Sequence, residues 1–337
     1  MSSPEPAAGT GDLTGRELTY AQAMALGLRE VLEADERVFL IGQAFFGITR
    51  YQTLIGDLTD MFPDRSWDPP IAELGYVGTG IGAAISGLRP IVDIGTASFI
   101  FQAFSQVVNE AANIHYMTGG QTRVPIVFHL LHGIRGSGAA QHSHSPQAML
   151  WNTPGLQIVT PSSPRDVRGF IHSAVESDNP VIWADHNKLF HVRGEVPDAP
   201  QAIPFGVAEV KRSGTDVTVV ATSYMVQRAL AVADRLTAEG ISVEVVDPRT
   251  LVPLDLKTIL ASVAKTGRLV IVDECHRSCG VGAEIAALVA EEAFDALRAP
   301  IRRVATLDVP IPLSRPLESF VEPSEDRVAA AIRASLG

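Results

Sequence analysis

Short apolar runs alternate with longer segments of helical periodicity along most of the chain. Runs typical of buried strands cover residues 38–41, 90–94, 124–131, 157–159 and 181–184. Before and between these strands, the apolar spacing predicts helices over 21–34, 75–86, 101–117 and 163–177. Thr19 is a suitable N-cap for the first helix, with Gln22 three residues on. Short strands that alternate with helices predict a parallel sheet covered by helices on both faces.

A second series of the same kind follows a proline-rich stretch, 197–204. Its expected strands are 216–221, 242–246, 268–273 and 301–304, and its expected helices are 225–239, 255–265, 281–297 and 324–336. The predicted fold class is therefore α/β, with two doubly wound domains. We place them at 17–196 and 205–337, joined by a linker at 197–204 and preceded by a disordered tail at 1–16.

The composition supports two globular cores and excludes several classes of protein. Hydrophobic residues make up 46% of the 337 residues, which is enough apolar mass for two domains. The formal net charge is −11 and no basic cluster is present, which argues against nucleic acid or an anionic membrane as a partner. The longest apolar stretch, 74–88, is shorter than the roughly 20 residues of a membrane-spanning helix. The N-terminus lacks a signal-peptide pattern, so we expect a cytoplasmic protein.

Closely spaced glycines and one acid mark the segment 71–82. The glycines at 75, 78, 80 and 82 are spaced like those of phosphate-binding loops, yet they lie within an apolar helical segment. Tight helix packing explains them better than a dinucleotide site. Glu73 comes directly before this helix, where a carboxylate is ordinarily a surface residue stabilised by the helix dipole. In an apolar neighbourhood its pKa would instead rise, and it would serve as a proton donor or relay.

The loop 133–146 is a second candidate for chemistry. His142 and His144 lie there among hydroxyl residues, and His132 precedes the loop. Three histidines suit acid–base work, contact with an anion, or a zinc ion, and the lack of a carboxylate among them favours the first two. Cys275 and Cys279 are too few for a cysteine zinc site and are not spaced as CxxC, so we interpret them as loop residues at a contact surface.

Seven segments, in their order and spacing, resemble one protein family. They are Asp68–Gly75, Gly87–Pro90, Phe99–Ala112, Tyr116–Gly120, Ala140–Ser143, Thr153–Leu156 and Asp247–Pro253. The family is the beta subunit of the thiamine-diphosphate-dependent first component of 2-oxo acid dehydrogenase complexes. Its members act on pyruvate, acetoin or branched-chain 2-oxo acids. The resemblance spans about Leu18–Leu336, and it implies a pyrimidine-binding domain followed by a transketolase C-terminal-like domain.

The resemblance also implies a set of site residues. Glu73 matches the glutamate that hydrogen-bonds a pyrimidine nitrogen of the cofactor and so promotes deprotonation of the thiazolium carbon. Phe99 matches the aromatic residue that packs on the pyrimidine, and Gln102 lies one turn further. His142 matches the histidine that handles charge and protons near the substrate or the lipoyl group. The second domain of the family carries no chemistry and mainly builds the dimer.

A missing motif implies a partner. The family binds the diphosphate and magnesium through a Gly-Asp-Gly motif on its alpha chain, and this sequence contains none. The chain is therefore expected to form half of an active site in an α2β2 heterotetramer, with a lipoyl acyltransferase as acyl acceptor. Some beta chains also hold potassium with backbone carbonyls. The matching positions here are Ile126, Ala174, Val175, Ser177 and Asn179.

Two departures from the family pattern leave alternatives open. Gln43 and Ala44 stand where the family usually has acids, and Gln43 cannot relay a proton as a carboxylic acid does. His144 adds a titratable group near the substrate where glutamine is common. These changes keep two alternatives in view, the beta half of a split transketolase-like or acyl- or ketol-transfer enzyme, and an inactive assembly scaffold.

Overall fold

The computed structural model describes residues 17–42 and 58–337, so the expected tail and Gln43 lie outside the described residues. The chain divides into two compact units. The first contains the described residues up to Leu131, with Thr153–Val159 and Ser163–Pro204; the second contains His132–Asn152, Thr160–Ser162 and Phe205–Gly337. The domain limits expected from the sequence stay a prediction. Within the described residues, no helix combines the length and the apolar character needed to cross a membrane.

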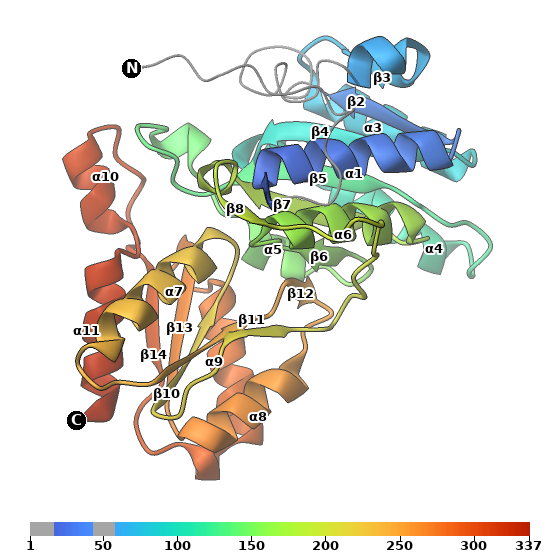
Figure 1. Ribbon diagram of the computed structural model, residues 1–337. Helices are drawn as coiled ribbons and strands as arrows, with labels where there is room; N and C mark the ends of the chain where they lie inside the picture. The colour runs from blue at the N-terminus through green and yellow to red at the C-terminus, as the bar shows by residue number, and fades with distance from the viewer. Residues whose placement is uncertain (1–16, 43–57) are drawn as a thin grey trace. The chain divides into compact units, whose positions relative to one another are not determined.

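The first unit is built on a parallel sheet whose strands run in the order β6-β7-β5-β4-β2-β3 (Figure 1). The strands of the first unit as a whole are β1 (Glu17–Thr19), β2 (Val38–Gly42), β3 (Ser66–Trp67), β4 (Arg89–Thr96), β5 (Val127–His132), β6 (Gln157–Val159), β7 (Val181–His186) and β8 (Arg193–Glu195). Its main helices are α1 (Tyr20–Ala34), α3 (Glu73–Ile85), α4 (Ile114–Met117) and α6 (Pro164–Glu176). Strands β1 and β8 form a separate antiparallel pair, which the sequence did not predict.

Helices α1 and α6 pack side by side (Figure 1). Thr19 caps α1 with the predicted capping box, because its side chain accepts from the Gln22 N–H and the Gln22 side chain accepts from the Thr19 N–H. Gly27 permits the close approach, since an added Cβ would lie 3.1 Å from Ile171 Cδ1 and 3.3 Å from Arg168 Cα. The first predicted helix and its cap are thus confirmed.

The segment 101–117, predicted as one helix, is divided into three pieces. A 3₁₀ helix (η3, Ala97–Ala103) is followed by a π-helical turn (η4, Gln106–Ala111) and then by α4. The Ala112 N–H donates to the Val107 carbonyl, which is the wide i→i+5 bond of a π-turn. The Asn113 side chain donates to the Val108 carbonyl at 2.9 Å and so gives the wide turn an additional hydrogen bond. Apolar periodicity alone does not distinguish these helix types.

The second unit contains a five-stranded sheet in the order β14-β13-β10-β11-β9, with β9 antiparallel at one edge. Its strands are β9 (Glu209–Arg212), β10 (Val217–Ala221), β11 (Val243–Asp247), β13 (Leu269–His276) and β14 (Arg302–Thr306), and a short strand β12 (Thr250–Val252) also belongs to this unit. Its helices are η5 (Ala140–His142), α5 (Gln147–Trp151), α7 (Tyr224–Thr237), α8 (Leu256–Thr266), α9 (Val281–Glu292), η7 (Phe294–Ala296), α10 (Arg315–Val321) and α11 (Glu325–Leu336).

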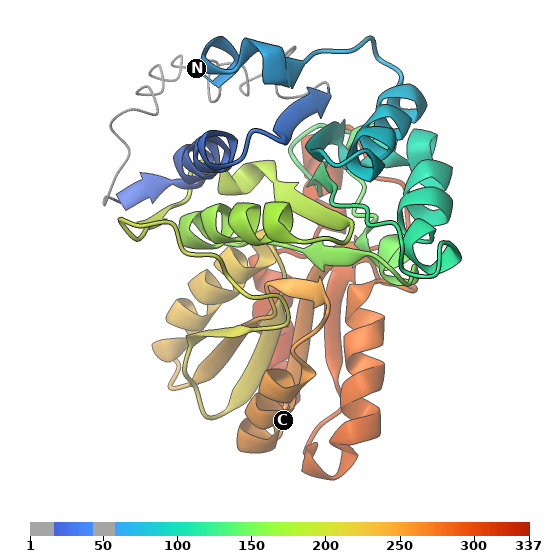
Figure 2. The same cartoon turned by 90° about the vertical axis from the view of Figure 1, so that its right-hand side faces the viewer.

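Helices cover both faces of this sheet (Figure 2), and alternate residues of β10 contact different helices, as a doubly wound fold requires. Val217 and Val219 belong to the apolar core that α7 and α11 complete. Thr218, between them in the sequence, donates to the Ser262 carbonyl of α8 at 3.0 Å. The predicted α/β class with two doubly wound domains is confirmed.

Candidate active site

Glu73 begins α3 and is almost buried, with 9% of its surface exposed. No side chain caps this helix end, so its amide groups favour an acid there. Gly80 explains part of the glycine pattern, because an added Cβ would lie 2.6 Å from Val92 Cγ2 of β4. Gly78 and Gly82 face open space instead. Tight packing of α3 is therefore confirmed at one glycine only.

The Glu73 carboxylate forms no hydrogen bond with any residue that the structure describes. Tyr76, one turn later, is 3% exposed, and its hydroxyl has no hydrogen-bond partner among the described residues. Burial raises the pKa of Tyr76, and the nearby Glu73 and Asp93 raise it further. An acid and a hydroxyl thus lie on the same helix face with hydrogen-bonding capacity to spare. The sequence reasoning missed Tyr76, although its i+3 spacing from Glu73 places it on that face.

Phe99 and Gln102 lie on η3, which packs against α3. Phe99 is half-buried and Gln102 is exposed. The strand before them is irregular, because the pairing of β4 with β5 shifts register between Asp93 and Gly95. The Asp93 carboxylate accepts from the Gly95 N–H at 2.9 Å and holds this bulge. The structure therefore brings the elements that carry Glu73, Phe99 and Gln102 together.

The end of β2 approaches the same strand closely. At Gly42, which has a φ of +142°, an added Cβ would lie 2.0 Å from the Asp93 carbonyl oxygen. Only glycine fits there, so β2 ends directly beside β4. A pocket of about 410 Å³ lies nearby, and Ile41, Trp67 and Tyr76 contribute to its lining.

A group of buried charges lies deeper in this unit. His129, Asp93 and Asp185 are each fully buried. His129 Nδ1 lies 2.9 Å from Asp93 Oδ1, and its Nε2 lies 3.2 Å from Asp185 Oδ2. Asp185 also accepts from the Tyr20 hydroxyl and, at 2.8 Å, from Trp183 Nε1. Burial alone would lower the pKa of His129, but the hydrogen bonds to Asp185 and Asp93 outweigh it and raise that pKa to about 9.

The two predicted loop histidines belong to the second unit, apart from the unit that contains Glu73. His142 ends η5, and both His142 and His144 are half-buried. Burial lowers the pKa of His144, and the nearby His276 lowers it further. His144 is therefore neutral at pH 7 and able to accept a proton. Its backbone carbonyl accepts from the Gly133 N–H at 3.0 Å, which closes the loop.

Three contacts within the second unit anchor this loop. His132 Nε2 lies 3.1 Å from Ser223 Oγ, and its Nδ1 lies 3.3 Å from Ser145 Oγ. Both carboxylate oxygens of Glu318 accept from the Ser137 N–H at 2.9 Å. His132 thus serves as an anchor, and the part of the chain that the structure describes contains no cluster of three or more metal-ligating side chains.

The two cysteines differ from each other. Cys275 is buried on β13, and its thiol donates to the Ser145 carbonyl at 3.3 Å, whereas Cys279 is exposed. The interpretation of both as loop residues at a contact surface is therefore wrong for Cys275. Burial, together with Asp273, raises the pKa of the Cys275 thiol, so it stays protonated.

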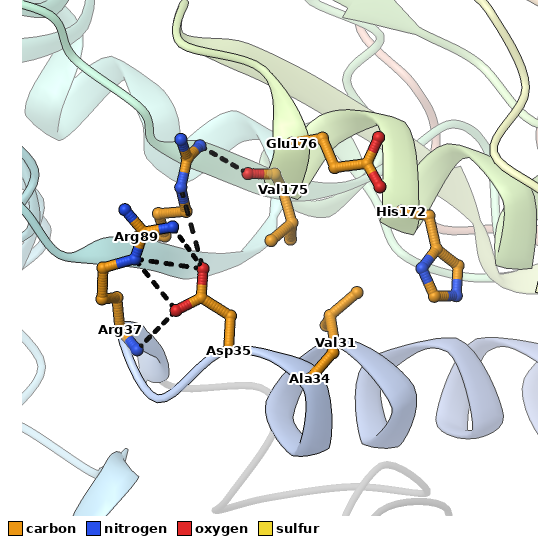
Figure 3. Close-up of a pocket in the computed structure, with 8 residues that line it drawn as sticks. All are labelled: Val31, Ala34, Asp35, Arg37, Arg89, His172, Val175 and Glu176. Carbon is orange, nitrogen blue, oxygen red and sulfur yellow. Dashed lines mark hydrogen bonds and ion pairs between the residues drawn. The ribbon is translucent and has the colours of Figure 1, made fainter.

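A second pocket of the first unit, about 260 Å³, is shown in Figure 3. Four of its charged or titratable side chains have partners: Asp35, Arg37, Arg89 and His172. The Asp35 carboxylate accepts from Arg37 at 2.7 Å, and His172 Nε2 lies 2.9 Å from Glu30 Oε2. Glu176, the remaining acid of the lining, is exposed and has no hydrogen-bond partner among the described residues, and we assign this pocket no chemistry.

Comparisons with known proteins agree with this architecture. Two family models match, "Transketolase, pyrimidine binding domain" over residues 16–191 and "Transketolase, C-terminal domain" over 206–328. The chain is 42% identical over 318 residues to the pyruvate dehydrogenase E1 component subunit beta of Rickettsia felis, covering 94% of this chain and 98% of that protein. It is 43% identical over 273 residues to the acetoin:2,6-dichlorophenolindophenol oxidoreductase subunit beta of Cupriavidus necator, covering 81% of each. A solved split-gene transketolase, described as an inactive beta4 tetramer, matches with a TM-score of 0.77 at 24% identity, over 95% of this chain and 99% of that one.

Proposed function

Because the chain belongs to the family of beta subunits of thiamine-diphosphate-dependent 2-oxo acid dehydrogenases, we propose that it forms half of a decarboxylating active site. In this proposal the assembled enzyme decarboxylates a 2-oxo acid and transfers the acyl group to a lipoyl carrier. The relatives act on pyruvate and acetoin by name, which supports a short-chain substrate. A cytoplasmic location is part of the same proposal.

The residues around Glu73 fit the aminopyrimidine part of thiamine diphosphate. The observation that carries the assignment is a nearly buried carboxylate, 9% exposed, that forms no hydrogen bond with a described residue. Such a carboxylate is available to accept a hydrogen bond from a ligand. Phe99, on the neighbouring η3, supplies an aromatic surface, and Gln102 a polar group. The cofactor supplies the nucleophilic carbon and the electron sink that decarboxylation needs.

In this arrangement Glu73 holds a proton at the pyrimidine nitrogen and orients the ring. The buried setting strengthens that hydrogen bond because the effective dielectric is low. Tyr76, with a spare hydroxyl on the same helix face as Glu73, is available to hydrogen-bond the same ligand. These are roles of the chain's own side chains, and each one can be altered singly.

We assign proton handling near the substrate to His142, with His144 as a neutral second base. The support is that both histidines belong to one loop, which is anchored through His132 and Glu318. Burial and His276 lower the pKa of His144, and a neutral imidazole beside a 2-oxo acid can accept a proton. Gln43 lies outside the described residues and stays a substrate-proximal candidate from the resemblance alone.

An alpha subunit supplies the diphosphate and magnesium contacts in this proposal. The sequence lacks the Gly-Asp-Gly motif for them. Large apolar side chains are exposed on the first unit between residues 71 and 117, and an exposed apolar surface of this kind indicates a protein interface. They are Ile71, Leu74, Ile85, Phe101, Tyr116 and Met117. We therefore propose an α2β2 heterotetramer, with a lipoyl acyltransferase as its acceptor.

The test co-expresses the chain with an alpha subunit of the same organism. Thiamine diphosphate and magnesium are titrated into the chain alone and into the complex by calorimetry, and carbon dioxide release is measured with a panel of 2-oxo acids. We expect cofactor binding in the complex only, together with release from at least one short-chain 2-oxo acid. Binding without release from any acid would favour the split transketolase-like alternative, and ketose donors would then be tested. A well-formed complex that binds no cofactor would identify an assembly scaffold.

A further inference from the structure

The five backbone carbonyls that the resemblance assigns to potassium lie in the first unit. Four belong to the end of α6 and the corner before β7: Ala174, Val175, Ser177 and Asn179; the fifth is that of Ile126. The last carbonyls of a helix lack intrahelical partners and carry partial negative charge. A cation is therefore expected at this corner, whatever its source.

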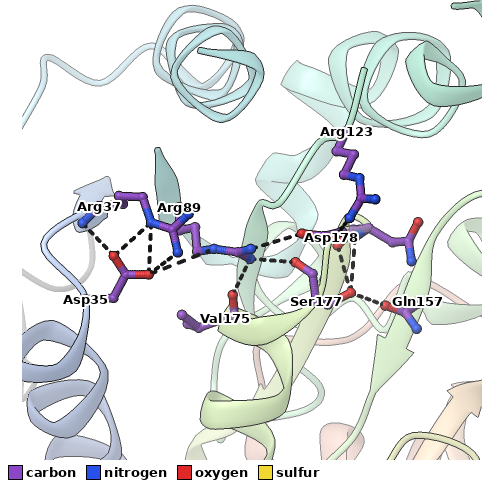
Figure 4. A network of polar contacts seen from close by, with 9 residues as sticks. Asp35, Arg37, Arg89, Arg123, Gln157, Val175, Ser177 and Asp178 are labelled. Atoms are coloured by element: carbon purple, nitrogen blue, oxygen red, sulfur yellow. Dashed lines mark hydrogen bonds and ion pairs between the residues drawn. The ribbon is translucent and has the colours of Figure 1, made fainter. Parts of the chain in front are cut away.

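The chain itself places a cation there. Arg89, at the start of β4, donates from Nη1 to the Val175 carbonyl at 2.7 Å and to the Ser177 carbonyl at 3.0 Å (Figure 4). Its Nη2 donates to Asp178 Oδ1 at 2.9 Å, and its Nε lies 4.0 Å from Asp35 Oδ2. One guanidinium thus contacts two of the five carbonyls and bridges two acids beside them.

A third carbonyl of the set is also engaged. The Ile126 carbonyl accepts from the Val181 N–H at 2.9 Å as β7 begins. The Ser177 hydroxyl, which is bonded to Gln157 Oε1 at 2.7 Å, also lies 3.3 Å from the Asn179 carbonyl. These donors tie the corner together without an ion.

Because Arg89 is largely buried, water screens its charge only weakly. Its side chain is 15% exposed, and burial together with Arg37 lowers its pKa, yet a guanidinium begins so high that it stays charged at neutral pH. A potassium ion at the same carbonyls would lie within a few ångströms of this charge. Two like charges so close repel strongly, and the carbonyls would have to release Arg89 first. The residues present do not fit the ion.

We infer that Arg89 serves as the built-in cation of this corner, so that the chain is stable without potassium and does not bind it there. The inference depends only on the contacts of the first unit. It stands or falls independently of the proposed reaction, because its test measures stability and metal occupancy and not turnover.

The experiment compares thermal unfolding of the full chain, co-purified with its alpha partner, in potassium, sodium and choline salts at equal ionic strength. The wild type is expected to show the same Tm in all three. Arg89→Met is expected to lower the Tm by roughly 5 °C in sodium, because two carbonyls and Asp178 lose a charged donor, and potassium should restore part of the loss. Arg123→Met is the matched control, since Arg123 contacts Asp178 but donates to none of the five carbonyls.

Two results would overturn the inference. One is a saturable rise in the wild-type Tm with potassium but not with sodium. The other is an Arg89→Met protein whose Tm ignores potassium, because the vacated carbonyls would then not form a cation site. If Arg89→Met fails to fold, crystals of the wild type soaked in rubidium decide the matter. An anomalous peak at the carbonyls of Val175 and Ser177 contradicts the inference, and a map without that peak supports it.

Discussion

The first unit contains two sets of buried polar groups that differ in how completely they are paired. Around His129, both ring nitrogens lie against carboxylates, and Asp185 accepts two further hydrogen bonds from Tyr20 and Trp183. Around Glu73, by contrast, neither the carboxylate nor the Tyr76 hydroxyl has a hydrogen-bond partner among the described residues. Burial is similar, at 0% exposure for His129 and 9% for Glu73.

We interpret the fully paired His129 cluster as structural and the unpaired Glu73 carboxylate as functional. A buried charge is tolerated only if it is paired and hydrogen-bonded, so the His129 cluster satisfies itself and needs nothing from outside. In the proposed function, a ligand completes the unpaired carboxylate at the start of α3. The comparison therefore predicts that changes at Glu73 act on the reaction and that changes at His129 act on stability.

The largest expected effect is on turnover when Glu73 is changed. Glu73→Gln keeps the shape of the side chain but cannot hold or give a proton, so kcat of the reconstituted complex should fall roughly 10²- to 10⁴-fold. The Tm should stay within a few degrees of the wild type, since no described hydrogen bond is lost. Glu110→Gln, at an exposed position of the same unit, is the control and should leave both quantities unchanged. A Glu73→Gln complex with normal turnover would remove Glu73 from the mechanism.

Changing His129 should lower the stability of the fold, in contrast to the effect of Glu73 on turnover. His129→Gln leaves Asp93 and Asp185 buried without their shared cation, so the free energy of unfolding should fall by about 3–5 kcal/mol. Urea unfolding of the full chain measures this. His172→Gln is a suitable control, because its partner Glu30 keeps the hydrogen bonds from Arg168. A loss no larger than that of the control would show that the cluster contributes little.

The same cluster predicts a pH dependence with a definite sign. The pKa of His129 is raised to about 9, above its value in the unfolded chain, so the folded state binds the extra proton. The resulting stabilisation is fully present below pH about 6.5 and is lost as the pH rises through about 9; a shift of this size corresponds to about 3 kcal/mol. Unfolding free energies measured between pH 6 and pH 10 should show this fall in the wild type and a flatter profile in His129→Gln.

Much of this fold was predictable because apolar periodicity and helix caps act locally. The strands 157–159 and 181–184 and the Thr19 cap appear where expected. The division of 101–117 into 3₁₀, π and α pieces was not predictable, because it depends on tertiary packing and on the Asn113 side chain. The antiparallel edge strand β9 was missed for a related reason, since its residues are half-buried or exposed and none is fully buried.

The candidate site was predictable in part. Glu73 was identified by resemblance, and the structure adds that its carboxylate lies nearly buried and lacks a partner among the described residues. His129 carried no sequence signal, because its partners Asp93 and Asp185 come from different strands and meet only in the folded sheet. Arg89 likewise reaches the carbonyls of α6 across 86 residues of chain, a distance over which sequence patterns carry no information.

The smallest expected effect concerns two buried tyrosines, of which one has a hydrogen-bonded hydroxyl and the other does not. Tyr76→Phe removes a hydroxyl without a partner, so stability should hold or rise by about 0.5–1 kcal/mol, while thiamine diphosphate should bind the complex roughly 3- to 10-fold more weakly. Tyr20→Phe removes a hydroxyl that donates to Asp185, so stability should fall by about 1–3 kcal/mol with cofactor affinity unchanged. Calorimetry and urea unfolding of both variants measure these four quantities. If the two variants behaved alike, unpaired hydrogen-bonding capacity would not mark the ligand site, and the contrast between the Glu73 and His129 regions would lose its functional meaning.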